Sequence, residues 1–181
     1  MRKLLIANRG KIAVRIARAC QAVGIPYVMV YSEADRDMPY LPTAERAVCI
    51  GPPVPASSYL NGRALLATAL GTGCDAIRPG YGFLSENADF AASCEAQGLT
   101  FVGPRPESIA TMGDKLAGRA CALAAGVPVV PGHDVDPGDV SGCVAAGRDV
   151  GALVNALLNG KDLGSVRIET GRNVAVTLDW Q

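Results

Sequence analysis

Hydrophobic and polar positions alternate along the first hundred residues in a strand–helix–strand rhythm. Short continuous apolar runs, typical of buried parallel strands, occur at Leu4–Ile6, Tyr27–Tyr31, Ala47–Ile50, Ala76–Ile77 and Thr100–Val102. Stretches with helical spacing lie between several of these runs, and the first of them carries an apolar stripe made of Ile12, Ile16, Cys20 and Val23. This alternation predicts an α/β fold, a doubly wound parallel sheet with helices on both faces.

Further helices are expected beyond the first one. The spacing predicts helices over Leu60–Leu70 and Asn87–Ala96, the second with Ser85 as its N-cap. Two helical pieces are expected between Pro106 and Ala125, divided near Gly113. These elements complete one domain that ends at about residue 132.

The pattern changes after Gly132. Residues 133–148 are rich in Gly, Asp and Val and are expected to form a linker, followed by a helix over 149–158. Alternation on both sides of Thr170–Asn173 predicts a β-hairpin, so residues 149–181 form an appendage. The apolar face of this hairpin is made of Val166, Ile168, Val174, Val176, Leu178 and Trp180. An isolated hairpin is marginal in water, so this face is expected to be buried against the sheet or another subunit.

Composition limits the classes of partner. Lys plus Arg and Asp plus Glu each total 17, so no net charge attracts nucleic acid or an anionic membrane. Lys11, Arg15 and Arg18 form the one basic stripe, which is expected to be a solvated helix face. No run approaches the roughly 20 apolar residues that span a bilayer. Neither nucleic acid nor a membrane is expected as a partner.

Cysteine usage bears on the compartment. The six cysteines are scattered with no C-x-x-C pair, and the chain has one His, so zinc ligation is not expected. Small buried thiols in a reducing compartment are the simpler interpretation. No signal peptide is visible in the sequence. These observations predict a cytoplasmic protein.

Two polar segments follow the first two predicted strands. The turn Asn8–Gly10 lacks the G-x-G-x-x-G pattern of dinucleotide sites. Glu33 and Asp35 follow the second strand, roughly where such folds place the acid that binds ribose. Without the glycine pattern, these acids are expected to cap a loop instead.

The loop after the fourth strand is open to two interpretations. Gly80 and Gly82 permit a positive φ, so the loop can pass close beneath a ligand. The same glycines also fit a turn that lets Phe83 and Leu84 pack into the core. The sequence leaves both interpretations open.

The sequence contains a series of motifs at Lys3–Cys20, Ser32–Asp37, Ser58–Asn61, Arg78–Asn87, Phe101–Pro104 and Met112–Lys115. Together they closely resemble the N-terminal domain of biotin carboxylase, in family order and at family spacing. The resemblance covers roughly Met1 to Gly132 and implies a Rossmann-like pre-ATP-grasp domain. Arg78 departs from it, because most relatives carry His at this position.

The resemblance implies a function. Biotin carboxylases make carboxyphosphate from ATP and bicarbonate and then carboxylate biotin, so ATP, Mg and biotin on a carrier protein are the implied cofactors. Nearly all catalytic residues of the family lie downstream of the resemblance. We therefore expect no catalytic residue and no metal site here, and no activity from the chain alone.

The resemblance also carries individual residues over. Lys115 matches a lysine that contacts the nucleotide, and the wall of the active site would consist of Gly80, Tyr81, Gly82 and Phe83. Arg15 and Arg18 are interface candidates, and Trp180 in the hairpin is a third. The implied partners are a second copy of the chain or other carboxylase subunits.

Two other functions remain open at the level of the sequence. The chain could be a non-catalytic assembly or regulatory protein whose hairpin pairs with a partner. It could also be the product of a rearranged gene whose tail is tolerated. Clean alternation over Val174–Trp180 argues against a random tail.

Overall fold

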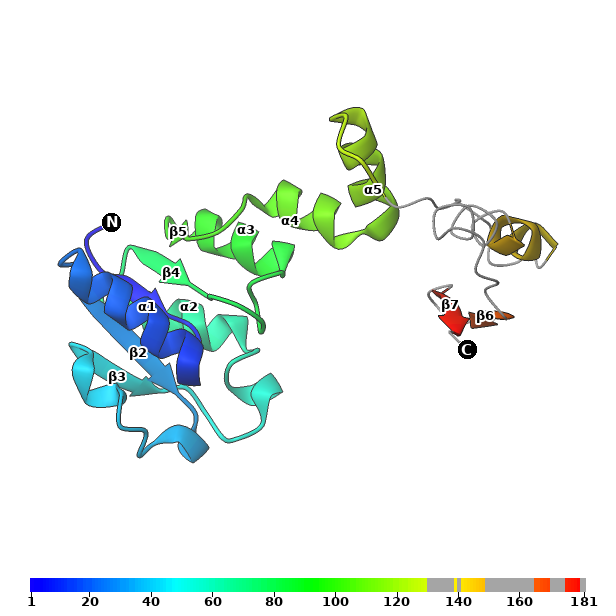
Figure 1. Ribbon diagram of the computed structural model, residues 1–181. Coiled ribbons are helices and arrows are strands. Elements are labelled where there is room, and N and C mark those ends of the chain that lie inside the picture. Colours follow the sequence, from blue (N-terminus) through cyan, green and yellow to red (C-terminus); the bar gives the residue numbers. More distant parts are fainter. Residues whose placement is uncertain (130–138, 140, 149–164, 170–174, 180–181) are drawn as a thin grey trace. The chain divides into compact units, whose positions relative to one another are not determined.

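The computed structural model describes residues 1–129, 139, 141–148, 165–169 and 175–179 (Figure 1). The chain divides into two compact units, Met1–Lys115 and Leu116–Gln181. The parallel sheet lies in the first of them.

The first unit is built on a five-stranded parallel sheet. Its strands are β1 (Leu4–Ile6), β2 (Tyr27–Tyr31), β3 (Arg46–Cys49), β4 (Ala76–Arg78) and β5 (Thr100–Phe101), in the order β3-β2-β1-β4-β5. Leu4 lies opposite Tyr27 of β2 and Ala76 of β4, and every pairing in this sheet is parallel. The predicted doubly wound parallel sheet is confirmed, with β3 one residue earlier than expected.

Helices and short 3-10 turns connect the strands. The helices are α1 (Gly10–Ala22), α2 (Gly62–Gly71), α3 (Ala88–Ala96), α4 (Pro106–Gly113) and α5 (Lys115–Ala124). The 3-10 turns are η1 (Glu33–Asp35), η2 (Leu41–Thr43) and η3 (Pro55–Ser57). The division expected near Gly113 separates α4 from α5.

The start of α3 corrects one prediction. Asn87, not Ser85, is the N-cap, and its side-chain oxygen accepts a hydrogen bond from the Phe90 N–H at 2.7 Å. Asn61 caps α2 in the same way, accepting from Ala64 N–H. The Ser85 N–H instead donates to the carbonyl of Gly82 within the preceding turn. Ser85 is therefore part of the loop that leads to the helix.

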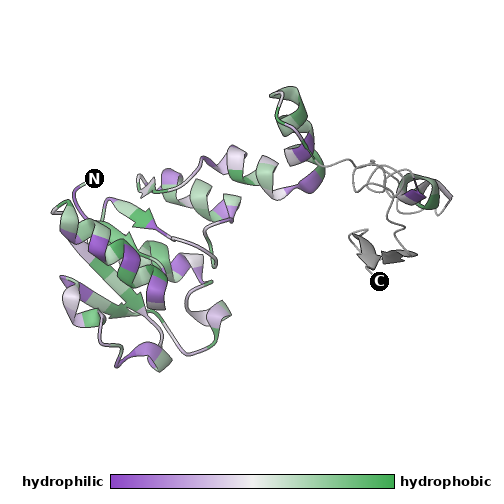
Figure 2. Ribbon diagram, in the orientation of Figure 1, coloured by the Kyte–Doolittle hydropathy of each residue, from purple (hydrophilic) through white to green (hydrophobic). Residues whose placement is uncertain are grey.

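The two faces of the sheet are covered differently. Helix α1 covers one face through small buried residues, Ala13, Ala17 and Cys20. Helices α2 and α3 pack on the other face, where Leu65 and Phe90 join a larger core. The strands between them are coloured as mainly hydrophobic in Figure 2.

The apolar stripe expected on α1 is only partly buried. Cys20 is buried, but Ile12 and Ile16 are half-buried and the Val23 side chain is 68% exposed. The alanines at positions 13 and 17 let the helix approach the sheet closely. The larger residues of the stripe are therefore displaced to its flank.

The second unit contains all but the first residue of α5, a further short helix and a two-stranded sheet among its described residues. Residues 141–148 are helical although they lie in the segment expected as a linker. The Asp139 carboxylate accepts a hydrogen bond from the Gly142 N–H at 2.9 Å, which favours a helix start. Strands β6 (Ser165–Glu169) and β7 (Ala175–Asp179) pair antiparallel, which confirms the strands of the predicted hairpin. The expected helix over 149–158, the turn 170–173 and Trp180 lie outside the described residues.

The cysteines fall into two groups by their exposure. Cys20, Cys74, Cys94 and Cys143 are buried, whereas Cys49 and Cys121 are exposed. No group of three His, Cys, Asp or Glu side chains that could hold a metal ion occurs among the described residues. No helix in the described part of the chain is long and apolar enough to cross a membrane.

Candidate functional site

The loops that follow β1 and β4 meet where the strand order reverses. Because β1 and β4 are neighbours and the chain leaves them in opposite directions, their carboxyl ends flank the crevice where open α/β sheets bind ligands. The Asn8 side chain is buried there, and its Nδ2 donates to the carbonyls of Pro79 at 2.5 Å and Tyr81 at 2.9 Å. The two loops are thus joined directly.

The loop after β4 is held close to α1 by its backbone. Gly80 has a φ of 78°, and a Cβ there would lie 2.6 Å from Cγ2 of Ile12. Only glycine fits this conformation and this close approach. Gly82 also has a positive φ, of 73°.

The same loop has one buried and one exposed end. Leu84 is buried in the core formed with α2 and α3, and Phe83 packs against that core. The Tyr81 side chain is 76% exposed. The turn that lets Phe83 and Leu84 pack into the core is therefore confirmed, and passage of the loop beneath a ligand stays a prediction.

A buried carboxylate organises the neighbouring loops. Asp35, 1% exposed, accepts hydrogen bonds from the Tyr59 hydroxyl at 2.7 Å, the Ser32 hydroxyl at 3.0 Å and the Arg9 guanidinium. The Ser32 N–H in turn donates to the Tyr59 oxygen at 3.0 Å. We call these four residues the Asp35 cluster.

The charge states in the Asp35 cluster follow from its contacts. Burial acts to raise the pKa of Asp35, but hydrogen bonds from Tyr59, Arg9 and Ser32 outweigh it and hold the pKa below its usual 3.8. Burial and the adjacent carboxylate raise the pKa of Tyr59 well above 10. At neutral pH Asp35 is therefore ionised and Tyr59 keeps its proton.

This arrangement explains the acids after the second strand. Both carboxylate oxygens of Asp35 accept bonds from the protein's own side chains, so the group is engaged in loop capping. At the start of α1, the Gly10 N–H donates to the Tyr40 hydroxyl at 3.0 Å. The acid at position 35 is thus occupied by the protein's own donors, unlike the acid that binds ribose in a dinucleotide site.

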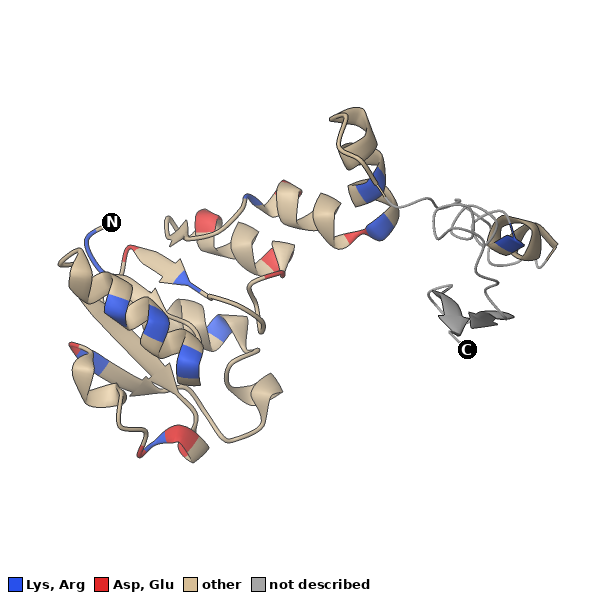
Figure 3. Ribbon diagram, in the orientation of Figure 1, with Lys and Arg blue, Asp and Glu red and all other residues tan. Residues whose placement is uncertain are grey.

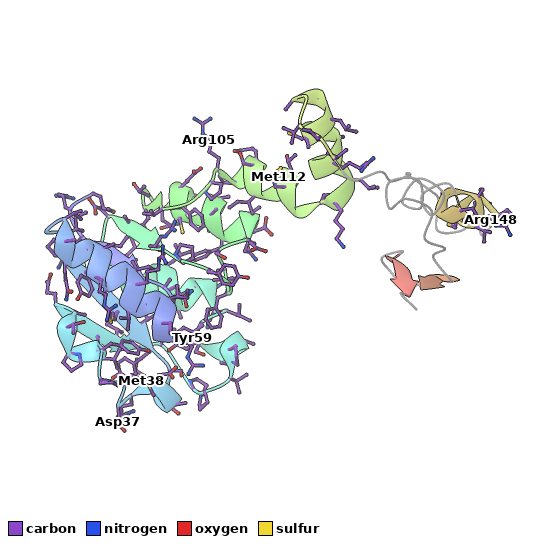
Figure 4. The ribbon with its side chains drawn as sticks, viewed as in Figure 1. Asp37, Met38, Tyr59, Arg105, Met112 and Arg148 are labelled. Carbon is purple, nitrogen blue, oxygen red and sulfur yellow. The ribbon has the colours of Figure 1, made fainter. Side chains whose placement is uncertain are left out.

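Tyr59 links the Asp35 cluster to the loop after β4. Its ring stacks on the ring of Phe83, with centroids 5.1 Å apart and planes inclined by 26°. The Arg9 guanidinium carbon lies 5.8 Å from the centre of the same ring. Figure 4 labels Tyr59, which precedes α2. Sequence reasoning missed Tyr59 and Arg9 as members of one cluster, because nothing in their local motifs indicates a contact between segments 50 residues apart.

An apolar cavity of about 650 Å³ lies beside this loop. Its lining includes Ile12, Ile16, Val23, Arg15, Arg78 and Tyr81. The Arg78 guanidinium donates to the carbonyl of Val102 at 2.5 Å, so this side chain is fixed across the ends of β4 and β5. The displaced large residues of α1 thus line a groove that extends from this loop to Leu4, at the start of β1.

The remaining predicted site residues lie on helices α1 and α5. Arg15 and Arg18 are exposed on α1, along which Figure 3 shows basic and no acidic residues. Lys115 is exposed and is the first residue of α5. The structure brings Gly80–Phe83 together with the turn after β1, and the roles of Lys115, Arg15 and Arg18 remain predictions.

Comparisons with known proteins bear on this site. The model of the family "Biotin carboxylase, N-terminal domain" matches residues 1–109. The chain is 57% identical over 132 residues to the biotin carboxylase of Allochromatium vinosum. It is 55% identical over 131 residues to the mitochondrial methylcrotonoyl-CoA carboxylase subunit alpha of Oryza sativa.

Solved structures agree with the sequence matches. A biotin carboxylase complex with β-γ-ATP from Campylobacter jejuni superposes with a TM-score of 0.78 at 41% identity, covering 83% of this chain and 34% of that one. The sequence matches cover 73% and 72% of this chain, but only 29% of the Allochromatium protein and 18% of the Oryza protein. The chain therefore spans less than a third of the length of these two curated relatives.

Proposed function

Because the chain belongs to the family of biotin carboxylase N-terminal domains, we propose that Met1–Lys115 forms one wall of the active site in a biotin-dependent carboxylase. The observation that carries the proposal is the position of Gly80–Phe83. This segment lies at the switch point of the sheet and presents Tyr81 to solvent. It is held by the hydrogen bonds from Asn8 at one end and by the burial of Leu84 at the other.

The family implies the use of ATP, magnesium and biotin, in which ATP activates bicarbonate and biotin accepts the carboxyl group. The resemblance implies that nearly all catalytic residues of the family lie downstream of the segment that this chain matches. In our proposal the metal ligands and the phosphate-binding glycines therefore belong to other parts of the enzyme.

In our proposal this chain contributes the shape of one side of the active site and contacts to the substrates. Gly80 and Gly82 let the backbone approach a substrate closely, and Tyr81 offers a ring and a hydroxyl at the surface of the loop. Lys115 adds a point charge at the beginning of α5, where the N-terminal N–H groups favour phosphate oxygens. One lysine does not hold a nucleotide alone, so we expect weak binding to the isolated chain.

The proposed partners are the other parts of such a carboxylase. The relatives named above include a carboxylase subunit, and a further structural relative is a single-chain, multi-domain long-chain acyl-CoA carboxylase. In our proposal Arg15 and Arg18 on α1, and the hairpin with Trp180, contact a second copy or another subunit. The family match does not favour the alternative of a purely regulatory protein.

A chimera tests this proposal. Residues 1–109 of this chain would replace the matching segment of the Allochromatium vinosum enzyme, and bicarbonate-dependent ATP hydrolysis would be measured with free biotin. We expect kcat/KM within about tenfold of the parent enzyme, equivalent to about 1.4 kcal/mol, and background turnover from the chain alone.

Two variants of the chimera serve as controls. Arg78→His restores the residue that most relatives carry and should bring kcat/KM closer to that of the parent. Tyr81→Ala should lower kcat/KM for biotin. If the folded chimera hydrolyses no ATP, with or without Arg78→His, this chain cannot serve as the active-site wall.

A further inference from the structure

We propose that Asp35, Tyr59 and Phe83 act in series as positioning residues for the loop Gly80–Phe83. Asp35 and Tyr59 need not touch a substrate, because they act through Phe83 at the end of the loop. The inference rests on the proposed function only in taking this loop as the active-site wall.

Phe83 is the element under strain. Its φ of 50° lies in the left-handed region, and among the described residues no other non-glycine residue has a positive φ. A side chain in this conformation persists only when its surroundings hold it there. The stack of its ring on Tyr59, at 5.1 Å, is the contact that does so.

Tyr59 is itself held at its far end. Its hydroxyl donates to Oδ2 of Asp35 and accepts from the Ser32 N–H, at 2.7 and 3.0 Å. With the oxygen bonded on both sides and the side chain buried, the plane of the ring is fixed. A fixed ring gives Phe83 a rigid surface to stack on.

Asp35 sets the position of Tyr59 relative to the sheet. Its carboxylate takes hydrogen bonds from three separate segments: the turn after β1, the end of β2 and the segment before α2. The conformation of the loop after β4 is thus linked to the ends of β1 and β2. The link runs through side chains because β4 and β2 are not neighbours in the sheet.

Hydrogen exchange on the full 181-residue chain tests this link. We expect Tyr59→Leu to raise amide exchange in residues 80–85 by roughly 2- to 12-fold, the effect of losing one aromatic stack. Tyr59→Phe keeps the ring but loses the hydroxyl, and should give a smaller increase. Asp35→Asn should fall between these two variants.

Met29→Ala provides the matched control. Met29 is fully buried on the opposite face of the sheet, in the core that packs on α1. It should lower global stability without a selective effect on the loop. If residues 80–85 exchange no faster in Tyr59→Leu than in Met29→Ala at equal stability, the inference is wrong.

Substitutions of Phe83 keep the test informative if Tyr59→Leu does not fold. Phe83→Tyr retains the stack and should preserve slow exchange of the loop, whereas Phe83→Leu should lose it. Equal exchange in these two variants would overturn the inference. These readouts need no catalysis, so an inactive chimera would refute the proposed function without touching this result.

Discussion

Two loop regions at the same edge of the sheet use polar residues in opposite ways. In the Asp35 cluster, side chains that follow β1 and β2 and one that precedes α2 bond to one another, and all but Arg9 are buried. In the loop after β4, the backbone carbonyls of Pro79 and Tyr81 are bonded to Asn8, while the Tyr81 side chain is free in solvent. A high density of charged and polar residues therefore marks a region of internal bonding here, and the glycine-rich loop is the one that presents a side chain to solvent.

The largest difference between the two regions should appear in the free energy of unfolding. Asp35→Ala leaves Tyr59, Ser32 and Arg9 without their acceptor and should cost about 3 kcal/mol. Tyr81→Ala removes an exposed side chain and should change stability by less than about 0.5 kcal/mol. Urea denaturation of both variants measures the contrast, and equal losses would contradict the distinction between the two regions.

A pair of glycines sharpens the comparison within the loop after β4. Gly80→Ala combines a positive φ with a clash against Ile12, and should destabilise by about 2–4 kcal/mol. Gly82→Ala has a similar φ, but a Cβ there meets nothing within 4 Å, so the cost should be only about 1 kcal/mol. Thermal denaturation distinguishes the two, and a Gly82→Ala variant as unstable as Gly80→Ala would show that backbone strain alone decides.

Asn8 joins the two regions, and its removal tests whether they depend on each other. Asn8→Ala leaves the Pro79 and Tyr81 carbonyls without a donor and should cost about 1–3 kcal/mol. Asn8→Asp keeps the shape but replaces the donor with an oxygen that faces those carbonyls. It should be no more stable than the alanine variant in urea denaturation at neutral pH. A stable Asn8→Asp protein would mean that the shape of residue 8, and not its donated bonds, holds the loop.

The smallest expected effect is the contribution of Asp35 to the fall in stability at low pH. The folded-state pKa of Asp35 lies below its usual 3.8, so its ionised form contributes stability that is fully present above about pH 4. That contribution is lost as the pH falls through the folded-state pKa. Asp35→Asn should therefore show a shallower fall in stability between pH 5 and pH 2 than the native chain, measured by urea denaturation. Parallel curves for the two proteins would indicate that Asp35 titrates alike when folded and unfolded.

The hairpin strands and the parallel sheet could be predicted because their signals are local. Apolar runs such as Leu4–Ile6 and Tyr27–Tyr31 are buried on both faces wherever they pair, and β6 and β7 follow from alternation alone. The motifs that carried the family resemblance are likewise continuous segments. The comparisons confirm that family over residues 1–109.

The errors arose where two adjacent candidates compete or where packing decides. Ser85 and Asn87 are both good N-caps, and the loop that positions Leu84 in the core leaves only Asn87 at the start of α3. On α1 the larger residues were expected to face the core, but the alanines at positions 13 and 17 allow the closer approach. Neither choice can be made from the helix sequence alone.

By itself, the sequence determined the order of elements, the parallel sheet and the loop that borders the crevice, since each depends on the spacing of residues within one segment. Only the tertiary structure decided that Arg9, Asp35 and Tyr59 form one cluster and that Phe83 stacks on it. These contacts join segments separated by 24 or more residues in the chain. Their partners are selected by how the strands are ordered in the sheet, and that order is a property of the whole fold.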